Sequence, residues 1–271
     1  MIDKLLENKI KDSSRENEVA VLLSGGVDSL SVAFTAHRLG KKVHAYTFCL
    51  ENNPTYDSQK AIDASNIMGW RCTKVEVPIN NLIEDFHTLR TKFACIKKTH
   101  YECTFPFLYV YPKIEEKEVI SGWAADGHYG VSKKACIHYK EPKELFDQFR
   151  IEYFGNSNPV AYMQQQYLSL KYKKDFIAPY LDSTIKDFFM QYDWYQLNKP
   201  YQKHHVVEAF PEFQKIGKPK PHINLQLGAG IDKAFEVLLE CKDINIKNRK
   251  RMLDVYRDWK NYGEIRTLYD C

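Results

Sequence analysis

Short apolar runs alternate with amphipathic runs of ten or more residues through the first half of the chain. The apolar runs are rich in branched residues and predict buried strands over residues 18–23, 41–50, 72–78 and 118–122. The amphipathic runs predict helices over residues 2–12, 30–40, 58–70, 79–96 and 104–114. Strands that alternate with helices of this length indicate an α/β fold, a parallel sheet with helices on both faces.

From about residue 140 the pattern becomes mostly helical. No Gly/Ser-rich linker and no internal repeat separates this part from the rest. We therefore expect a single domain over residues 1–271. Its α/β core would cover residues 17–135, and a mostly helical part at 136–271 would pack directly on the sheet.

Composition narrows the class of protein. The chain has 39 basic and 35 acidic residues, and 44% of it is apolar, which excludes a disordered or collagen-like protein. Seven cysteines are scattered without a CxxC pair, and the N-terminus is charged where a signal peptide is apolar. The longest early apolar run, residues 19–23, is too short to cross a membrane. We expect reduced thiols, a cytoplasmic location and no membrane partner.

Glycine is sparse but clustered. Eight of the 12 glycines fall within residues 25–26, 122–130 and 217–230, which suggests three places where the backbone closely approaches something else. The first cluster lies in the string SGGVDS, residues 24–29, between a predicted strand and a predicted helix. Glycine N–H groups, serine hydroxyls and a helix N-terminus together form a phosphate cradle. Asp28 would repel phosphate unless a divalent cation lies between them, so we assign it to Mg²⁺.

The loop is not a Walker A loop, because the GxxxxGK[ST] lysine is absent, and it is not GxGxxG. SGGVDS resembles the pyrophosphate loop of the N-type ATP pyrophosphatases (the PP-loop superfamily), which include asparagine, β-lactam, NAD and GMP synthetases. The resemblance implies a Rossmann-like (HUP) fold, with ATP and Mg²⁺ as cofactors. It also implies cleavage of ATP to AMP and pyrophosphate as a substrate oxygen is adenylated. The ATP-binding residues implied in this way are Leu23, Ser24, Gly25, Gly26, Asp28, Ser29, Phe48, Ser121 and Gly122.

The second glycine cluster favours asparagine and β-lactam synthetases among these relatives. Residues 119–126, VISGWAAD, resemble the SGxGADE segment at the end of their fourth strand. The resemblance implies that Ser121 and Gly122 line the nucleotide and that Asp126 pairs with Asp28 around the metal. Two carboxylates at the carboxyl ends of neighbouring strands are well placed for that task.

Two later segments extend the resemblance. Residues 177–182 are similar to the PFLD segment of the same synthetases, and residues 198–203 follow after a helix, so Asp182 and Lys203 are candidates for contact with the substrate. In the family, a lysine of a mobile loop holds the α-phosphate and the leaving pyrophosphate. Lys220 matches that catalytic lysine best, and Lys218 remains the alternative.

The sequence departs from the family at the proposed base. Trp123 stands where the family has a glutamate that assists the attacking nitrogen, and Gly127 replaces the glutamate after Asp126. Trp123 could instead stack on an aromatic substrate. Candidates for the base, without positional support, are Glu102, His100, Tyr101 and His128.

A second departure concerns the nitrogen donor. Position 2, the catalytic cysteine of the family's glutaminase part, is Ile2, so we expect no glutaminase here. Ammonia or an amine, in the substrate or from a separate protein, would be the nucleophile.

These patterns predict an amidoligase-type enzyme that adenylates a carboxylate or amide oxygen of a small molecule and lets an amine displace AMP. Two alternatives stay open. One is a PP-loop enzyme that modifies a nucleotide or nucleic-acid base, and the other is a degenerate protein that binds ATP or AMP without catalysis. The sequence does not determine the oligomeric state.

Overall fold

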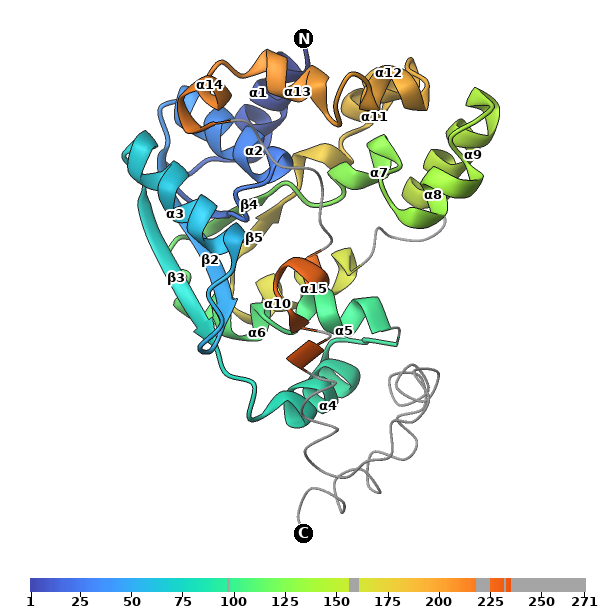
Figure 1. Ribbon diagram of the computed structural model, residues 1–271. Coiled ribbons are helices and arrows are strands. Elements are labelled where there is room, and N and C mark those ends of the chain that lie inside the picture. The colour runs from blue at the N-terminus through green and yellow to red at the C-terminus, as the bar shows by residue number, and fades with distance from the viewer. Residues whose placement is uncertain (97, 156–160, 218–224, 232, 235–271) are drawn as a thin grey trace.

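The computed structural model describes residues 1–96, 98–155, 161–217, 225–231 and 233–234. Its centre is a parallel five-stranded sheet with strand order β3-β2-β1-β4-β5 (Figure 1). The register pairs Glu18 with Lys42 and Ala20 with Val119. The strands are β1 (Glu18–Leu22), β2 (Lys42–Leu50), β3 (Arg71–Val77), β4 (Glu118–Ser121) and β5 (Asp175–Ile177). The predicted α/β fold, Rossmann-like with a parallel sheet between helices, is confirmed.

Helices cover both faces of the sheet (Figure 1). Those before β4 are α1 (Ile2–Ser13), α2 (Val27–Arg38), α3 (Tyr56–Met68), α4 (Leu82–Lys92), α5 (Lys98–Thr104) and α6 (Phe107–Val110), followed by the 3₁₀ turn Tyr111–Lys113. Between β4 and β5 lie α7 (Ala125–Tyr129), α8 (Lys133–His138), α9 (Lys143–Phe154) and α10 (Tyr162–Lys171). After the 3₁₀ turn Pro179–Leu181 come α11 (Ser183–Met190), α12 (Trp194–Asn198), α13 (His204–Ala209), α14 (Glu212–Ile216) and α15 (Leu225–Gly228).

Alternation along β1 divides the core in two. Val19 and Val21 point to one face, with α1, α2, α11 and α13, and Ala20 and Leu22 point to the other, with α4, α5 and α6. All four side chains are buried, because a central parallel strand has helices on both sides. The near-continuous apolar run of this strand is therefore explained by its position.

The first four predicted strands and the helices between them are confirmed within a few residues, but the four-strand expectation was incomplete. β5 has three residues and lies where the pattern predicted helix to continue. It follows α10 closely and pairs in parallel with β4, Ile120 opposite Ile177. The part predicted to be helical therefore also supplies an edge strand, and this strand ties it to the sheet.

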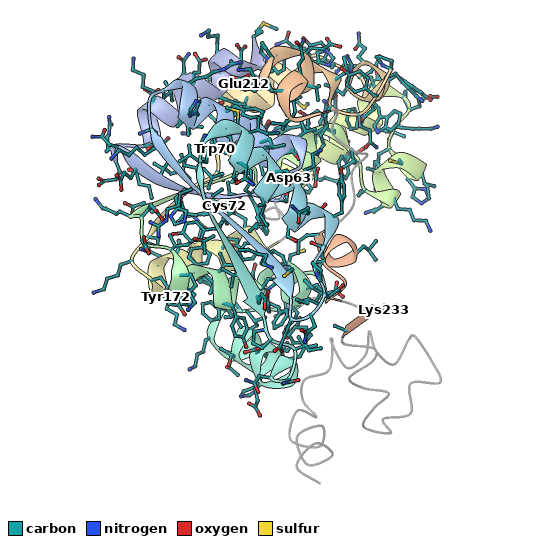
Figure 2. All side chains as sticks on the ribbon, turned by 60° about the vertical axis from the view of Figure 1, so that its left-hand side comes forward. Asp63, Trp70, Cys72, Tyr172, Glu212 and Lys233 are labelled. Atoms are coloured by element: carbon teal, nitrogen blue, oxygen red, sulfur yellow. The ribbon has the colours of Figure 1, made fainter. Side chains whose placement is uncertain are left out.

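Long-range polar contacts fasten the outer helices. Arg38 of α2 donates two hydrogen bonds of 2.7 Å to the Glu212 carboxylate of α14. Trp70, on the same side of the sheet in Figure 2, donates to His37 Nδ1 at 3.2 Å. The Arg38–Glu212 pair holds α14 against α2, the helix that begins at the SGGVDS loop, and Trp70 joins the segment before β3 to the same helix.

None of the helices in the described part of the chain is long and apolar enough to cross a membrane.

Candidate active site

The SGGVDS loop joins the carboxyl end of β1 to α2. Ser24 Oγ lies 3.1 Å from Ser29 Oγ, and Ser29 Oγ donates to the Gly26 carbonyl at 3.1 Å. Gly26 occupies the N-cap position of α2 without a side-chain cap. The first N–H groups of α2 thus keep the open, positively polarised arrangement that binds phosphate.

Two glycines of the predicted site are required by close packing. Gly25 has φ +72°, and a Cβ there would lie 2.9 Å from Lys60 Cβ. A Cβ at Gly122 would lie 2.5 Å from the Asp28 carbonyl carbon and 2.8 Å from Ser29 N. The end of β4 therefore touches the first turn of α2, and this contact fixes the position of Asp28.

Asp28 and Asp126, the residues predicted to hold a metal, both contact the ammonium group of Lys203. Lys203 Nζ donates to Asp126 Oδ1 at 2.7 Å and also contacts Asp28 Oδ2. The two carboxylate oxygens are therefore no further apart than two hydrogen-bond lengths. Asp28 comes from the first turn of α2, Asp126 from the first turn of α7, and Lys203 from the residue before α13.

Lys203 is held in a strained and buried position. It has φ +63° and is 4% exposed, and its Nζ lies 5.2 Å from the centre of the Tyr129 ring. Burial alone would lower the pKa of Lys203, but the charges of Asp126 and Asp28 outweigh burial and raise it. Lys203 is therefore a cation here, in contact with both carboxylates.

The donor set fits Mg²⁺. Carboxylate oxygens are the ligands that this hard cation prefers, and the side chain of Asp126 is 43% exposed, so the pair is open on one side. Asp28 and Asp126 would hold the ion, and they would share their carboxylates between it and the Lys203 ammonium group. The sequence placed Lys203 only among residues near the substrate, and its contact with both carboxylates was not foreseen.

Phe48 and Trp123, both predicted for the site, contact the same aromatic ring. The Phe107 ring of α6 meets Phe48 edge to face at 5.7 Å and Trp123 at 5.9 Å. The structure therefore brings together one residue predicted for ATP and one predicted for the substrate. Both side chains are partly buried, so each also packs on the core.

Tyr153 of α9 was not foreseen at the site. A Cβ on Gly127 would lie 2.2 Å from Tyr153 Cε1, so the ring fills the space of the side chain that Gly127 lacks. Burial first, then the charges of Asp126, Cys103 and Asp28, raise the pKa of Tyr153. Its hydroxyl stays protonated within electrostatic reach of both carboxylates. In the sequence, only the glycine at position 127 indicates that another side chain could fill this space.

Of the base candidates, His128 is excluded by its surroundings. The imidazole stacks between Phe154 and Phe189, with ring centres 4.4 and 4.5 Å away, and Nε2 lies 2.8 Å from the Tyr180 carbonyl oxygen. Burial lowers the pKa of His128 to about 3, so it is a neutral core residue.

The other base candidates lie on α5. Tyr101 is fully buried and its hydroxyl donates to the Cys95 carbonyl oxygen at 2.7 Å, which makes it a core residue. Glu102 is 1% exposed, and His100 Nδ1 lies 3.4 Å from Gln164 Nε2. Neither observation assigns a role as the base, which stays a prediction for both residues.

Asp182 does not join the carboxylate pair. It caps the N-terminus of α11, accepting from Thr184 N at 2.9 Å, and forms an ion pair of 3.1 Å with Lys9. These local contacts account for its carboxylate. Lys218 and Lys220, the predicted catalytic lysines, lie outside the described residues.

Two of the predicted ATP-binding positions are buried. Leu23 N–H donates to the Tyr46 carbonyl oxygen at 2.8 Å, and Ser121 at the end of β4 is 4% exposed. Their contact with a nucleotide remains a prediction.

Comparison with known proteins finds similarity in the first part of the chain. Residues 1–132 match the family model described as asparagine synthase. The tRNA-specific 2-thiouridylase MnmA of Ehrlichia canis (strain Jake) is 33% identical over 112 residues, which are 35% of this chain and 29% of that relative. The chain thus spans less than a third of the length of this relative.

A solved structure, of a predicted subunit of tRNA methyltransferase from Methanocaldococcus jannaschii, shares 15% identity, with a TM-score of 0.36. The match covers 64% of this chain and 74% of that one. The SGGVDS loop, Asp28 and Asp126 all lie within residues 1–132, the part of the chain that matches the asparagine synthase family model.

Proposed function

We propose that the protein is an AMP-forming ligase that adenylates an oxygen of a small molecule and joins that molecule to an amine or ammonia. The acceptor oxygen attacks the α-phosphorus of ATP, and the bond to the β-phosphate breaks, releasing pyrophosphate. The nitrogen then attacks the activated carbon, loses a proton and displaces AMP. One C–N bond forms, and the leaving oxygen stays on AMP.

The chain's own residues have distinct tasks in this proposal. The N–H groups after Gly26 and the hydroxyls of Ser24 and Ser29 bind phosphate oxygens. Asp28 and Asp126 would hold Mg²⁺, which neutralises phosphate charge when bound. Lys203 orients both carboxylates and supplies a fixed positive charge beside them. Lys220, or in its place Lys218, is proposed to stabilise the departing pyrophosphate.

The observation that carries the proposal is the meeting of Asp28, Asp126 and Lys203 at the carboxyl edge of the sheet, beside the loop. Asp28 and Asp126 are 98 positions apart in the sequence, yet they share one ammonium group. Ligands of open α/β sheets bind at this edge. A protein that used the loop only as a tight turn would have no need to bring two carboxylates there.

The test is product analysis with a matched pair of variants. The protein is incubated with ATP, Mg²⁺ and ammonium chloride, together with a panel of small carboxylates and amides, and AMP is measured. Asp28→Asn should lower AMP formation by about 100-fold or more, because it removes a ligand charge. Asp187→Asn, an exposed position on α11, should leave it unchanged. ADP as the sole nucleotide product would refute the proposal.

A second function, modification of a tRNA base, is favoured by the likeness to a tRNA-specific 2-thiouridylase. The described cysteines limit how the protein could carry the sulfur for such a reaction. Burial raises the pKa of each of the five described cysteines, to about 12 for Cys95 and Cys103, so none of the five is held as a thiolate. A thiol that carries sulfur would have to be Cys241 or Cys271, which lie outside the described residues, or belong to another protein.

One assay of AMP release distinguishes the two proposed functions. AMP release that rises with added tRNA and falls steeply as salt is increased would support base modification. AMP release that depends on a small acceptor and ammonium, with weak dependence on salt, would support the ligase.

A further inference from the structure

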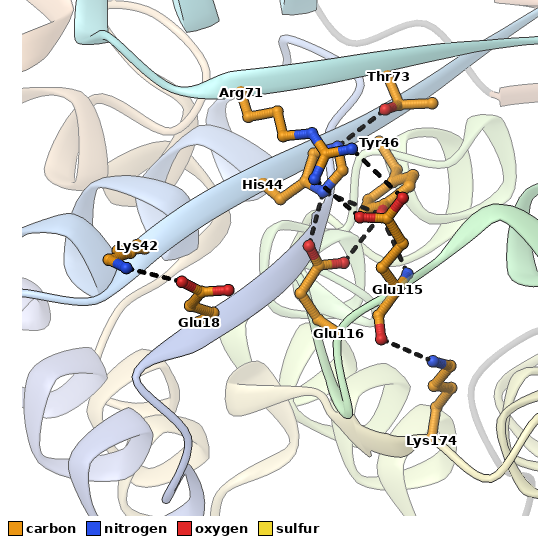
Figure 3. Close-up of polar contacts among 9 residues, drawn as sticks. All are labelled: Glu18, Lys42, His44, Tyr46, Arg71, Thr73, Glu115, Glu116 and Lys174. Atoms are coloured by element: carbon orange, nitrogen blue, oxygen red, sulfur yellow. Dashed lines mark hydrogen bonds and ion pairs between the residues drawn. The ribbon is translucent and has the colours of Figure 1, made fainter.

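The amino edge of the sheet carries a second polar cluster, unrelated to the nucleotide loop. It comprises His44 and Tyr46 of β2, Thr73 of β3, and Glu115 and Glu116, which precede β4 (Figure 3). In a parallel sheet all strands start at one edge, so this cluster lies at the opposite end of the strands from Asp28 and Asp126. We call it the amino-edge cluster.

From its geometry we propose that the amino-edge cluster is a binding site for a transition-metal ion such as Zn²⁺, with His44 Nδ1, Glu116 and Glu115 as ligands. One ligand atom from each lies within 4.8 Å of the others. Atoms around a tetrahedral zinc ion stand about 3.4 Å apart for metal–ligand bonds of about 2.1 Å, so side-chain adjustments suffice to close the set. Imidazole with two carboxylates suits zinc or manganese better than magnesium.

The orientation of the imidazole supports this assignment. His44 Nε2 lies 2.8 Å from Thr73 Oγ1, which can accept the Nε2 proton, and Tyr46 Oη lies 2.9 Å from Nδ1. An ion bound at Nδ1 would replace the proton through which Nδ1 contacts its oxygen partners. Nδ1 lies 2.6 Å from Glu116 Oε1. A histidine ligand usually has its second nitrogen fixed by such a partner, because this sets both the tautomer and the direction of the ring.

Glu116 is supported in the same way. Tyr46 Oη donates to Glu116 Oε2 at 2.8 Å, and the Glu115 N–H donates to Tyr46 Oη at 3.2 Å (Figure 3). The side chains of His44 and Glu116 are only 5% and 7% exposed. Chance groupings of acidic side chains lie on open surface, whereas these two ligands are buried and oriented by a second layer of hydrogen bonds.

Glu115 provides the route of entry. Its side chain is 64% exposed and forms an ion pair with Arg71, which is 62% exposed, at 2.7 Å. An ion pair as exposed as this is weak. Glu115 can therefore exchange Arg71 for an entering ion, and Arg71 becomes a competitor of the metal. Removing the positive charge of Arg71 should therefore strengthen metal binding.

The test is a Zn²⁺ titration of the full chain against a chromophoric chelator. His44→Gln and Glu116→Gln should each weaken the tightest site by at least about 10-fold, whereas Arg71→Gln should tighten it. Asp126→Asn, at the other edge, should leave it unchanged. The Co²⁺-substituted protein should show no thiolate charge-transfer band, because none of the proposed ligands is a cysteine.

Several results would overturn the assignment. Zinc affinity that is unchanged in His44→Gln, or weakened in Arg71→Gln, would show that the cluster is a hydrogen-bond network only. Loss of the site in Asp126→Asn would place the ion at the other edge. If His44→Gln fails to fold, Arg71→Gln decides alone, since it alters an exposed side chain. A rise in melting temperature with Zn²⁺ should accompany binding in the wild type.

Discussion

The charged side chains at the two edges of the sheet are paired in different ways. At the carboxyl edge, two carboxylates share the single ammonium of Lys203, and the adjoining loop leaves N–H groups uncapped. At the amino edge, His44 contacts Thr73 and Glu116 through its two ring nitrogens, and Glu115 has Arg71. At one edge two carboxylates meet at one ammonium group, whereas at the other each glutamate of the amino-edge cluster has a basic partner, Glu116 with His44 and Glu115 with Arg71.

This difference separates a site proposed for substrate from a site proposed to hold a structural ion. Carboxylates gathered beside a phosphate-binding loop are typical of a functional site. A satisfied network stabilises the fold, since each buried polar group has a partner. Variants at the carboxyl edge should therefore change turnover more than stability, and variants at the amino edge should do the reverse.

The largest effect is expected for Lys203→Met. Without the ammonium, Asp28 and Asp126 repel each other, and turnover to AMP should fall by about 100-fold. The free energy of unfolding should fall by about 1–3 kcal/mol, less than for a fully buried pair because Asp126 is half exposed. Added Mg²⁺ should restore part of the lost stability. Chemical denaturation of the variant at several Mg²⁺ concentrations measures this recovery. Lys199→Met is the control, and an equal response to Mg²⁺ in both variants would contradict the arrangement.

Gly122→Ala should have the next largest effect. The new methyl group would collide with backbone atoms of Asp28 and Ser29, which cannot rotate away as a side chain can. We expect a loss of about 1–3 kcal/mol in the free energy of unfolding and reduced affinity for ATP, measured by urea denaturation and calorimetry. Wild-type stability together with wild-type affinity would show that β4 does not fix the loop.

Tyr153→Phe should lower kcat/KM for AMP formation by about 10-fold, because one hydrogen-bond donor near the carboxylates is lost. The ring remains and still fills the space beside Gly127, so the melting temperature should change little. Tyr139→Phe is a matched control, since Tyr139 belongs to the same aromatic group through Phe149, 5.6 Å away. Equal activity of the two variants would remove Tyr153 from the site.

At the amino edge, Glu118→Gln should leave AMP formation unchanged. The Glu118 carboxylate accepts from Arg15 N at 2.8 Å and from Ser14 Oγ, and it is 4% exposed. Removing its charge should lower the free energy of unfolding by about 1–3 kcal/mol, measured in urea. If Glu118→Gln lost AMP formation but kept the wild-type free energy of unfolding, the proposed difference between the two edges would be wrong.

The nucleotide loop could be predicted from the sequence because SGGVDS directly follows an apolar strand, which is a local signal. The pairing of Asp28 with Asp126 was expected from the family resemblance, and the structure brings the two carboxylates together through α7, the helix after β4. β5 was not predicted because a strand of three residues is too short to show a hydrophobic periodicity. Its place in the sheet depends on pairing with β4.

Contacts between distant segments were the least predictable. Lys203 was named near the substrate, but its position between Asp28 and Asp126 depends on how α13 packs. Tyr153 and Gly127 form one unit through a contact between α9 and α7, and no spacing in the sequence reports such a contact. His128 looked like a base because histidine titrates near neutral pH, and only its aromatic neighbours show that it stays neutral.

The central claim is that the carboxyl edge is built to break ATP at its α-phosphorus. Phosphorus NMR of a reaction that contains the protein, Mg²⁺, ATP, ammonium and an acceptor mixture tests it most directly. The account predicts AMP and pyrophosphate in equal amounts, and their loss in Asp28→Asn. ADP and inorganic phosphate, formed at the same rate by the wild type and by Asp28→Asn, would contradict it.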